Sequence, residues 1–309
     1  MARRLAAAHH QEPISALATW ARWIAVFALV AVTVSVIVVR FGFLEYRPAL
    51  MTFFGALALA GLAILVAFAG FAAIWVSGAR GLGRITTALA ISVAILAYPA
   101  YLGWQYHKLP KIHDITTDPI DPPSFDVLVR LRSSDGANPA VYAGLYSAEQ
   151  QRRAYPDIEP LVLETTPQRA YDAALKLIGK RKWLVVDARA PQAPARPGHI
   201  EAVARTPLLG LREDIAIRIL PDADGTRIDM RSSSRYFESD LGSNAARILK
   251  FAEDLTGAVE AAEAARAEKA PTLPARSSHA TDKGKTGKGA KDKAAKDKAA
   301  RDKAQPAKR

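Results

Sequence analysis

The sequence contains no cysteine among its 309 residues, and histidine is scarce. A chain without cysteine has no disulfide framework, no thiolate nucleophile and no cysteine-ligated metal site. His113 and His199 lie 86 residues apart, which is not the clustered pattern of a metal site. The serines at 232–234 lack the context of a nucleophile elbow. The sequence therefore predicts no metal ion, no cofactor and no catalytic residue, and it leaves open whether the chain is an enzyme.

Charged residues are absent from three long apolar stretches, at 23–39, 49–76 and 85–104. Each approaches or exceeds the roughly 20 apolar residues that a helix needs to span a bilayer. The backbone there must be helical, because hydrocarbon offers no hydrogen-bond partners. Four tryptophans mark the ends of these stretches, where an amphipathic ring prefers the headgroup level; they are Trp20, Trp23, Trp75 and Trp104. The pattern predicts three transmembrane helices within residues 23–104, and the first run is too long for a cleaved signal peptide.

Basic residues in the short loops favour a cytoplasmic N-terminus, at residues 1–22, because positive charge is enriched on the cytoplasmic side. One side of the predicted spans carries five such residues, and the other carries four. The first set is Arg3, Arg4, Arg22, Arg80 and Arg84; the second is Arg40, Arg47, Lys108 and Lys111. With three spans, this asymmetry places the rest of the chain outside the cytoplasm.

Small residues are frequent in the second apolar stretch, namely Ala56, Ala60, Gly61, Ala67 and Gly70. Small side chains let membrane helices approach closely, which suits packing within the chain or a homo-oligomer formed through these helices. Polar residues inside the spans are few, whereas a transporter or channel normally carries intramembrane polar or charged groups. Anchoring to the lipid bilayer is therefore the better interpretation.

Beyond the spans, residues 105–160 form a proline-rich lead-in, and residues 161–262 have the periodicity of a folded domain. Thr166 followed by Pro167 favours a helix start, and Gly179 ends that helix. Strands are predicted at 161–164, 183–188, 199–206, 214–220 and 226–234, and a last helix at 241–262. The order β-α-β-β-β-β-α favours an antiparallel sheet with helices on one face. The predicted fold class is α+β, behind three transmembrane helices and ahead of a disordered tail.

Alternation along the last two strands sorts their side chains between two faces of the sheet. Pairing the isoleucines of 215–219 with Ile228 and Met230 places Arg218 opposite Asp229. The other face then carries charged residues, namely Glu201, Arg218, Asp229, Arg231 and Arg235, with Arg227 near the turn. Two interpretations stay open. This face is either solvated and laced with ion pairs that contribute little, or a pocket whose planar guanidinium groups fix an anion.

A series of short motifs between Ile112 and Leu255 is similar to one known family. They are Ile112–Asp118, Pro122–Phe125, Ala154–Ile158, Ile200–Ala202, Asp214–Arg218, Asp229–Arg235 and Asp240–Ile248. In this order they resemble the domain-of-unknown-function 1499 family of uncharacterised bacterial and chloroplast-lumen proteins. The resemblance implies an extracytoplasmic domain and no established reaction. It adds Asp240 and Asn244 to the polar positions of interest, where a helix cap and a buried hydrogen bond are the structural alternatives.

Residues 263–309 form a predicted disordered tail rich in lysine and alanine. From Pro271 onward it has 12 Lys and Arg against 4 Asp, a net of +8 out of +12 for the whole chain. Dense charge with low hydrophobicity predicts disorder. Outside the cytoplasm its partners would be anionic lipid headgroups or envelope polymers rather than nucleic acid. The alternative is a solubilising tail without a specific partner.

Together these patterns predict a multi-pass protein of a bacterial inner membrane with a periplasmic C-terminal domain. The favoured hypothesis is an envelope binding or scaffolding module whose arginine-rich face holds an anionic group. Its candidate ligand-binding residues are Glu201, Arg218, Asp229, Arg231, Arg235, Asp240 and Asn244. The alternative is a membrane-surface enzyme of unknown reaction that uses Glu201 or Asp240 as acid or base.

Overall fold

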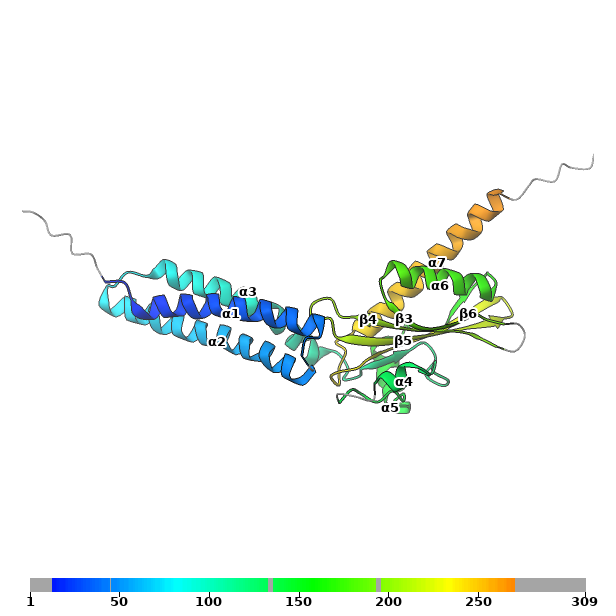
Figure 1. The fold of residues 1–309 in the computed structure, drawn as a ribbon, viewed down its shortest axis with the longest axis horizontal. Helices are drawn as coiled ribbons and strands as arrows, with labels where there is room; N and C mark the ends of the chain where they lie inside the picture. The colour runs from blue at the N-terminus through cyan, green and yellow to red at the C-terminus, as the bar shows by residue number, and fades with distance from the viewer. Residues whose placement is uncertain (1–12, 45, 133–135, 193–195, 270–309) are drawn as a thin grey trace, which may run out of the picture. The chain divides into compact units, whose positions relative to one another are not determined.

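The computed structural model describes residues 13–44, 46–132, 136–192 and 196–269, and its N-terminal part is a bundle of three helices (Figure 1). Helix α1 runs over Ala16–Phe41, α2 over Tyr46–Ser77 and α3 over Leu82–Lys108. By length and composition all three can cross a membrane. The three predicted helices are thus confirmed, and each extends a few residues beyond its apolar stretch.

Several small residues of α2 serve packing inside this bundle, whereas a Cβ atom at Gly61 would meet nothing within 4 Å. Ala63 and Ala67 are buried in one cluster with Ala18 and Ala21 of α1. At Gly70 a Cβ atom would lie only 3.1 Å from the backbone nitrogen of Ala18, so a side chain there would force the helices apart. Close packing of α2 is therefore achieved within one chain, and a homo-oligomer stays a prediction.

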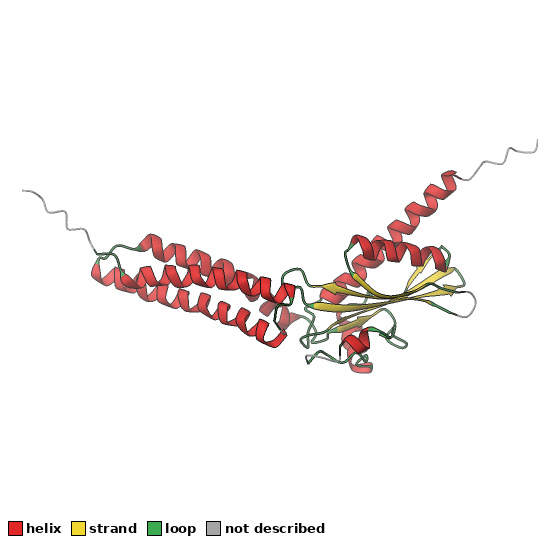
Figure 2. Cartoon of the chain, viewed as in Figure 1, coloured by secondary structure: helices red, strands yellow, loops and turns green. Residues whose placement is uncertain are grey.

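The second part of the chain is an antiparallel sheet with helices, as Figure 2 shows, so the α+β prediction is confirmed. Its strands are β1 (Asp114–Thr116), β2 (Leu161–Leu163), β3 (Leu184–Arg189), β4 (Gly198–Arg205), β5 (Arg212–Asp222) and β6 (Gly225–Ser234). The strand order is β1-β6-β5-β4-β3, and β2 also pairs with β6. In the β5–β6 pair Arg218 lies opposite Asp229, which is the predicted register.

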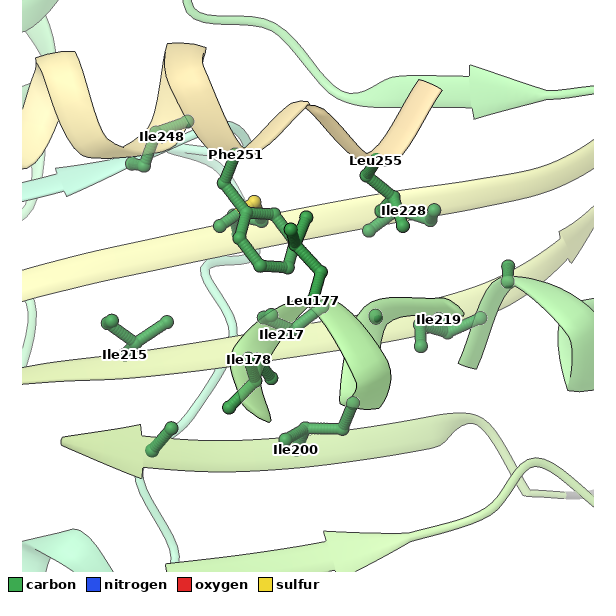
Figure 3. Packing of buried hydrophobic residues seen from close by; sticks show 14 of the residues in the cluster. Leu177, Ile178, Ile200, Ile215, Ile217, Ile219, Ile228, Ile248, Phe251 and Leu255 are labelled. Carbon is green, nitrogen blue, oxygen red and sulfur yellow. The ribbon is translucent and has the colours of Figure 1, made fainter. Parts of the chain in front are cut away.

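Helices α6 (Pro167–Lys180) and α7 (Ser243–Lys269) cover one face of this sheet (Figure 1). Figure 3 shows Ile178 of α6 and Phe251 of α7 above the isoleucines of the strands, among them Ile217. The core forms here because every second residue in the middle of β4, β5 and β6 is apolar and points to the same side. The ring of Trp183 closes one end by stacking on Phe251, with 5.4 Å between the ring centres.

The opposite face is covered by the lead-in, where the sequence predicted irregular structure. Helices α4 (Leu128–Leu131) and α5 (Leu145–Ala154) lie on this side (Figure 1), and Phe125 and Leu128 pack against Val203 and Ala216 of the sheet. Strand β1 also belongs to the lead-in, so the sheet domain begins well before residue 161. At the other end α7 continues past Ala262 to Lys269; the predictions for residues 1–12 and 270–309 lie outside the described residues.

Candidate functional site

Arg231, one of the predicted anion-binding residues, is buried under the lead-in. Its guanidinium forms two hydrogen bonds to the carboxylate of Asp114, at 3.0 and 2.6 Å, and another to the carbonyl of Ala140 at 2.7 Å. The ring of Phe125 lies 4.4 Å from its central carbon. Because only 3% of its side chain is exposed, Arg231 is held as a structural cation and is not open to a ligand.

Arg235 is engaged in the same way, by Asp214. Its Nε atom lies 2.9 Å from Asp214 Oδ1, while Nε of Arg132 lies 2.6 Å from Asp214 Oδ2. All three side chains are at least 96% buried. The charged face therefore differs from both interpretations of the sequence, because this part of it is neither solvated nor a hollow. The sequence did not indicate Arg132 or Asp114, since both lie in the lead-in and meet the strands only through the tertiary fold.

Asp240 and Asn244 have structural roles: Asp240 caps a helix, and Asn244 forms buried hydrogen bonds. The Asp240 carboxylate accepts hydrogen bonds from the backbone N–H groups of Gly242 and Asn244, at 3.0 and 2.9 Å, and so caps α7. Burial raises the pKa of Asp240, and these two hydrogen bonds oppose the rise. The side-chain amide of Asn244 donates to the carbonyl of His113 and to Ser234 Oγ, both at 3.0 Å.

A buried polar network missed at the sequence level surrounds Asn244. Ser232 Oγ donates to its amide oxygen at 2.8 Å, and Arg247 donates to the same oxygen at 2.7 Å. Arg247 also pairs with Glu213, which accepts from Ser243 Oγ at 2.8 Å. Ser232, Ser243, Asn244 and Arg247 lie in motifs of the family resemblance, whereas Glu213 lies just before one. The network ties the start of α7 to the end of β6.

Glu201 is buried beneath the start of α4, where it receives backbone hydrogen bonds. The N–H groups of Asp126 and Leu128 each donate to it at 2.7 Å, and that of Val127 at 3.1 Å. His199 Nε2 lies 3.1 Å from the same carboxylate. Burial alone would raise the pKa of Glu201, but the hydrogen bonds from His199 and the three N–H groups outweigh it and lower the pKa. A carboxylate held in this way is a weak base and is not poised to donate a proton.

Arg218 is the predicted residue that reaches an accessible hollow. Its Nη2 atom lies 2.8 Å from Asp229, which is fully buried, and its Nη1 atom lies 2.6 Å from Asp121, whose side chain is 77% exposed. It lines a cavity of about 340 Å³ that we call the polar pocket. The pocket is formed by Asp121, Pro122, Ser124, Asp126, Arg189, Arg196, Pro197, His199 and Arg218.

Two residues that line the polar pocket, Asp126 and His199, form a group with the buried Glu201 that has the spacing of a metal site. Ligand atoms of Asp126, His199 and Glu201 all lie within 4.8 Å of one another. The oxygen atoms of both carboxylates already have partners. Glu201 accepts hydrogen bonds from the N–H groups at the start of α4. Asp126 pairs with Arg189 and accepts a hydrogen bond from Ser124 at 2.8 Å. The guanidinium of Arg189 on Asp126 also opposes a cation there. These two carboxylates are therefore engaged within the protein.

The comparisons with known proteins agree with the motifs. Residues 114–255, from β1 to the middle of α7, match the model of a family described as a protein of unknown function, DUF1499. No curated protein matches the chain. The matched range includes every side chain that lines the polar pocket, together with the buried Arg231–Asp114 and Arg235–Asp214 pairs.

Proposed function

We propose that this chain, whose residues 114–255 form a domain of the DUF1499 family, is a membrane-anchored binding module that holds an anionic group in the polar pocket. The observation that carries this proposal is the convergence of three arginines and His199 on one hollow. Guanidinium forks match the geometry of phosphate and carboxylate oxygens. The pocket size is at the lower end of the range for small-molecule sites, which suits a compact charged group.

An anion that enters the polar pocket competes with the carboxylate of Asp121 for the guanidinium of Arg218. Asp121 is largely exposed, and exposed ion pairs contribute at most about 1 kcal/mol. The anion takes the place of this carboxylate on the outer side of the guanidinium. Asp229 stays on the inner side and keeps the guanidinium in position, because it is fully buried and bonded to both Nε and Nη2. Arg218 is thus oriented by Asp229, by Asp118 at 3.5 Å and by the backbone carbonyl of Asp121 at 2.8 Å. The exposed carboxylate of Asp121 is the partner that the ligand displaces.

Arg196 supplies the second contact, from the loop between β3 and β4. Its backbone is fixed by paired hydrogen bonds with Gln192, both 2.9 Å, and its side chain is exposed at the mouth of the pocket. The anchored backbone keeps Arg196 at the pocket, and closing on an anion costs only the ordering of its side chain. The pair Arg196 and Arg218 therefore forms the binding contact of the proposal, and His199 lies on the floor.

The location proposed for this module is a bacterial inner membrane, with the domain in the periplasm. The support is the charge asymmetry of the loops and the family resemblance. The lysine-rich tail would add electrostatic adhesion to anionic lipids or envelope polymers. Since the chain has no cysteine, Ser277→Cys with an impermeant thiol reagent reports the side of the tail: labelling in intact spheroplasts is expected, and labelling only after lysis would contradict the location.

The enzyme hypothesis is less well supported by the same geometry. Glu201 has a lowered pKa and its oxygens are saturated by N–H groups. Asp240 has a raised pKa, as a general acid requires, yet both of its oxygens are used to cap α7. Both carboxylates hold a helix start in place, and binding is the better-supported function.

The test uses the full chain in detergent. Binding of inorganic phosphate is followed by line broadening in phosphorus NMR, and binding of acetate, the second anion, by line broadening in proton NMR. Broadening is expected for the wild type and is expected to fall strongly in Arg196→Ala. Arg196 is exposed, so its truncation leaves the fold intact. Arg218→Ala is expected to abolish binding.

The matched control is Arg153→Ala on α5, where the arginine forms an exposed pair with Glu149. It removes the same charge away from the pocket and is expected to leave the broadening unchanged. Equal broadening in Arg196→Ala and Arg153→Ala would show that the binding is unspecific charge attraction. If neither anion showed line broadening with the wild type at millimolar concentration, the proposal would be contradicted.

A further inference from the structure

A second and larger cavity, of about 740 Å³, lies between the helix ends of α2 and α3 and two loops of the domain. We call it the apolar cavity. The loops are residues 206–211, between β4 and β5, and residues 236–242, between β6 and α7. Its walls are mostly apolar side chains, including Phe53, Leu102, Leu208, Leu209, Phe237 and Leu241. Its volume is within the range of cavities that hold a ligand.

Hydrogen bonds hold both loops against the helix ends. The guanidinium of Arg40, at the end of α1, donates to the carbonyls of Pro207 and Leu208, and Arg205 donates back to the carbonyl of Arg40 at 3.1 Å. In the other loop, Ser239 Oγ donates to the carbonyl of Pro110, just after α3, at 3.3 Å. The cavity is therefore bounded by fixed walls on the side of the domain.

The level of the apolar cavity along the helices is that of the membrane interface. Leu102 lies in α3 two residues before Trp104 and six before Lys108, the last residue of the helix, and the ammonium group of Lys108 is 3.8 Å from the centre of the Trp104 ring. Tryptophan and a lysine that reaches outward are typical of the boundary between hydrocarbon and headgroups. The cavity thus adjoins the hydrocarbon on one side and the domain on the other.

Backbone strain is concentrated at this cavity. Among the described residues, three that are not glycine have a left-handed backbone, with φ values of 66° at Phe237, 52° at Leu241 and 56° at Lys182. Phe237 and Leu241 both line the cavity, and Lys182 does not. A positive φ is unfavourable for a residue with a bulky side chain, and such residues cluster at ligand sites. Here the strain places two large apolar side chains at the wall of one cavity.

We infer that the apolar cavity takes an acyl chain of a bilayer phospholipid. Water is a poor occupant, because a buried water needs several polar partners and these walls offer few. Lipid hydrocarbon adjoins the α2 and α3 walls, so an acyl chain enters without crossing water. Arg212 is exposed at the rim, where its cation suits the phosphate of the headgroup. This inference is independent of anion binding in the polar pocket.

The experiment places the full chain in liposomes of phosphatidylethanolamine and phosphatidylglycerol that contain a phospholipid with a diazirine near the end of one acyl chain. After illumination, crosslinked peptides are mapped by mass spectrometry. Crosslinks are expected in residues 206–211 and 236–242, which lie outside the three spans and line the cavity. Phe237→Gly is expected to reduce those crosslinks several-fold without lowering the unfolding temperature, because glycine relieves the strained backbone while removing the ring.

The matched control is Lys182→Gly, which relieves the same kind of backbone strain far from the cavity and is expected to leave crosslinking unchanged. Crosslinks confined to the three spans of the wild type would overturn the inference. So would equal crosslinking of the two loops in Phe237→Gly and Lys182→Gly. Neither result depends on phosphate binding by Arg196 and Arg218, so the two proposals succeed or fail separately.

Discussion

The two faces of the sheet are built from alternate residues of the same strands, yet they are held together by different forces. On one face Ile215, Ile217 and Ile219 of β5 pack against α6 and α7. On the other, Asp214 and Arg218 of the same strand are bound to charged partners beneath the lead-in. Apolar packing is non-directional and tolerates small changes of shape. A buried ion pair depends on both members, because either one alone is an uncompensated charge.

The comparison teaches that the lead-in is bound to the sheet by charge pairing more than by apolar area. Its apolar contacts with the sheet centre on Phe125 and Leu128. Its charged residues Asp114 and Arg132 each form a buried pair with a strand residue. Such pairs are weak evidence for net stability, but they position the covering segment and hence one wall of the polar pocket.

The largest loss of stability is expected from a substitution on the charged face of the sheet. Asp114→Asn keeps the volume of the side chain and leaves Arg231 buried without its counter-charge, so we expect the domain to lose about 3–5 kcal/mol of unfolding free energy. Hydrogen exchange of domain peptides in the detergent-solubilised chain measures this loss. Combining Asp114→Asn with Arg231→Met is expected to restore much of it. A single variant as stable as the wild type would show that the pair is dispensable.

A smaller effect is expected on the apolar face. Ile217→Val removes one buried methyl group and leaves no polar atom without a partner, so the expected loss is about 0.5–1.5 kcal/mol. The same exchange measurement applies, and Glu149→Ala on the surface of α5 serves as a near-neutral reference. If Ile217→Val cost as much as Asp114→Asn, the proposed difference between the two faces would be lost.

The smallest expected effect is a pH-dependent change of the unfolding temperature, and it concerns Glu201 on the charged face. The pKa of Glu201 is lowered in the folded chain, so its stabilising contribution is present above its ordinary value of 4.5 and is lost as the pH falls toward the folded pKa. Glu201→Gln is therefore expected to unfold at a lower temperature than the wild type at neutral pH, with a gap that narrows in acid. Thermal unfolding over a pH series measures this gap.

Asp240 provides a control of opposite sign. Burial raises its pKa, so its contribution is present below its ordinary value of 3.8 and is lost as the pH rises through the folded pKa. Asp240→Asn is expected to lose less stability than the wild type as the pH rises, because asparagine does not ionise. If the gap for Glu201→Gln were the same at every pH, the hydrogen bonds to Glu201 would not depend on its charge.

Local patterns predicted much of this molecule. The three apolar helices, the order of β2 to α7 and the Arg218–Asp229 register follow from periods of 3.6 and 2 and from short connections. The lead-in did not follow from such patterns, because β1, α4 and α5 are short and are stabilised by distant partners. The candidate site was predicted in part: Arg218 reaches a pocket, whereas Arg231 and Arg235 do not.

Which residues alternate onto the charged face of the sheet follows from the sequence, since strand geometry fixes this locally. Which of those charges are covered depends on contacts between distant segments. Asp114 and Arg231 are 117 residues apart in the chain, and they meet because β1, in the lead-in, pairs with β6. The direction of a side chain is a property of its own strand, but its accessibility depends on whichever distant segment packs above it.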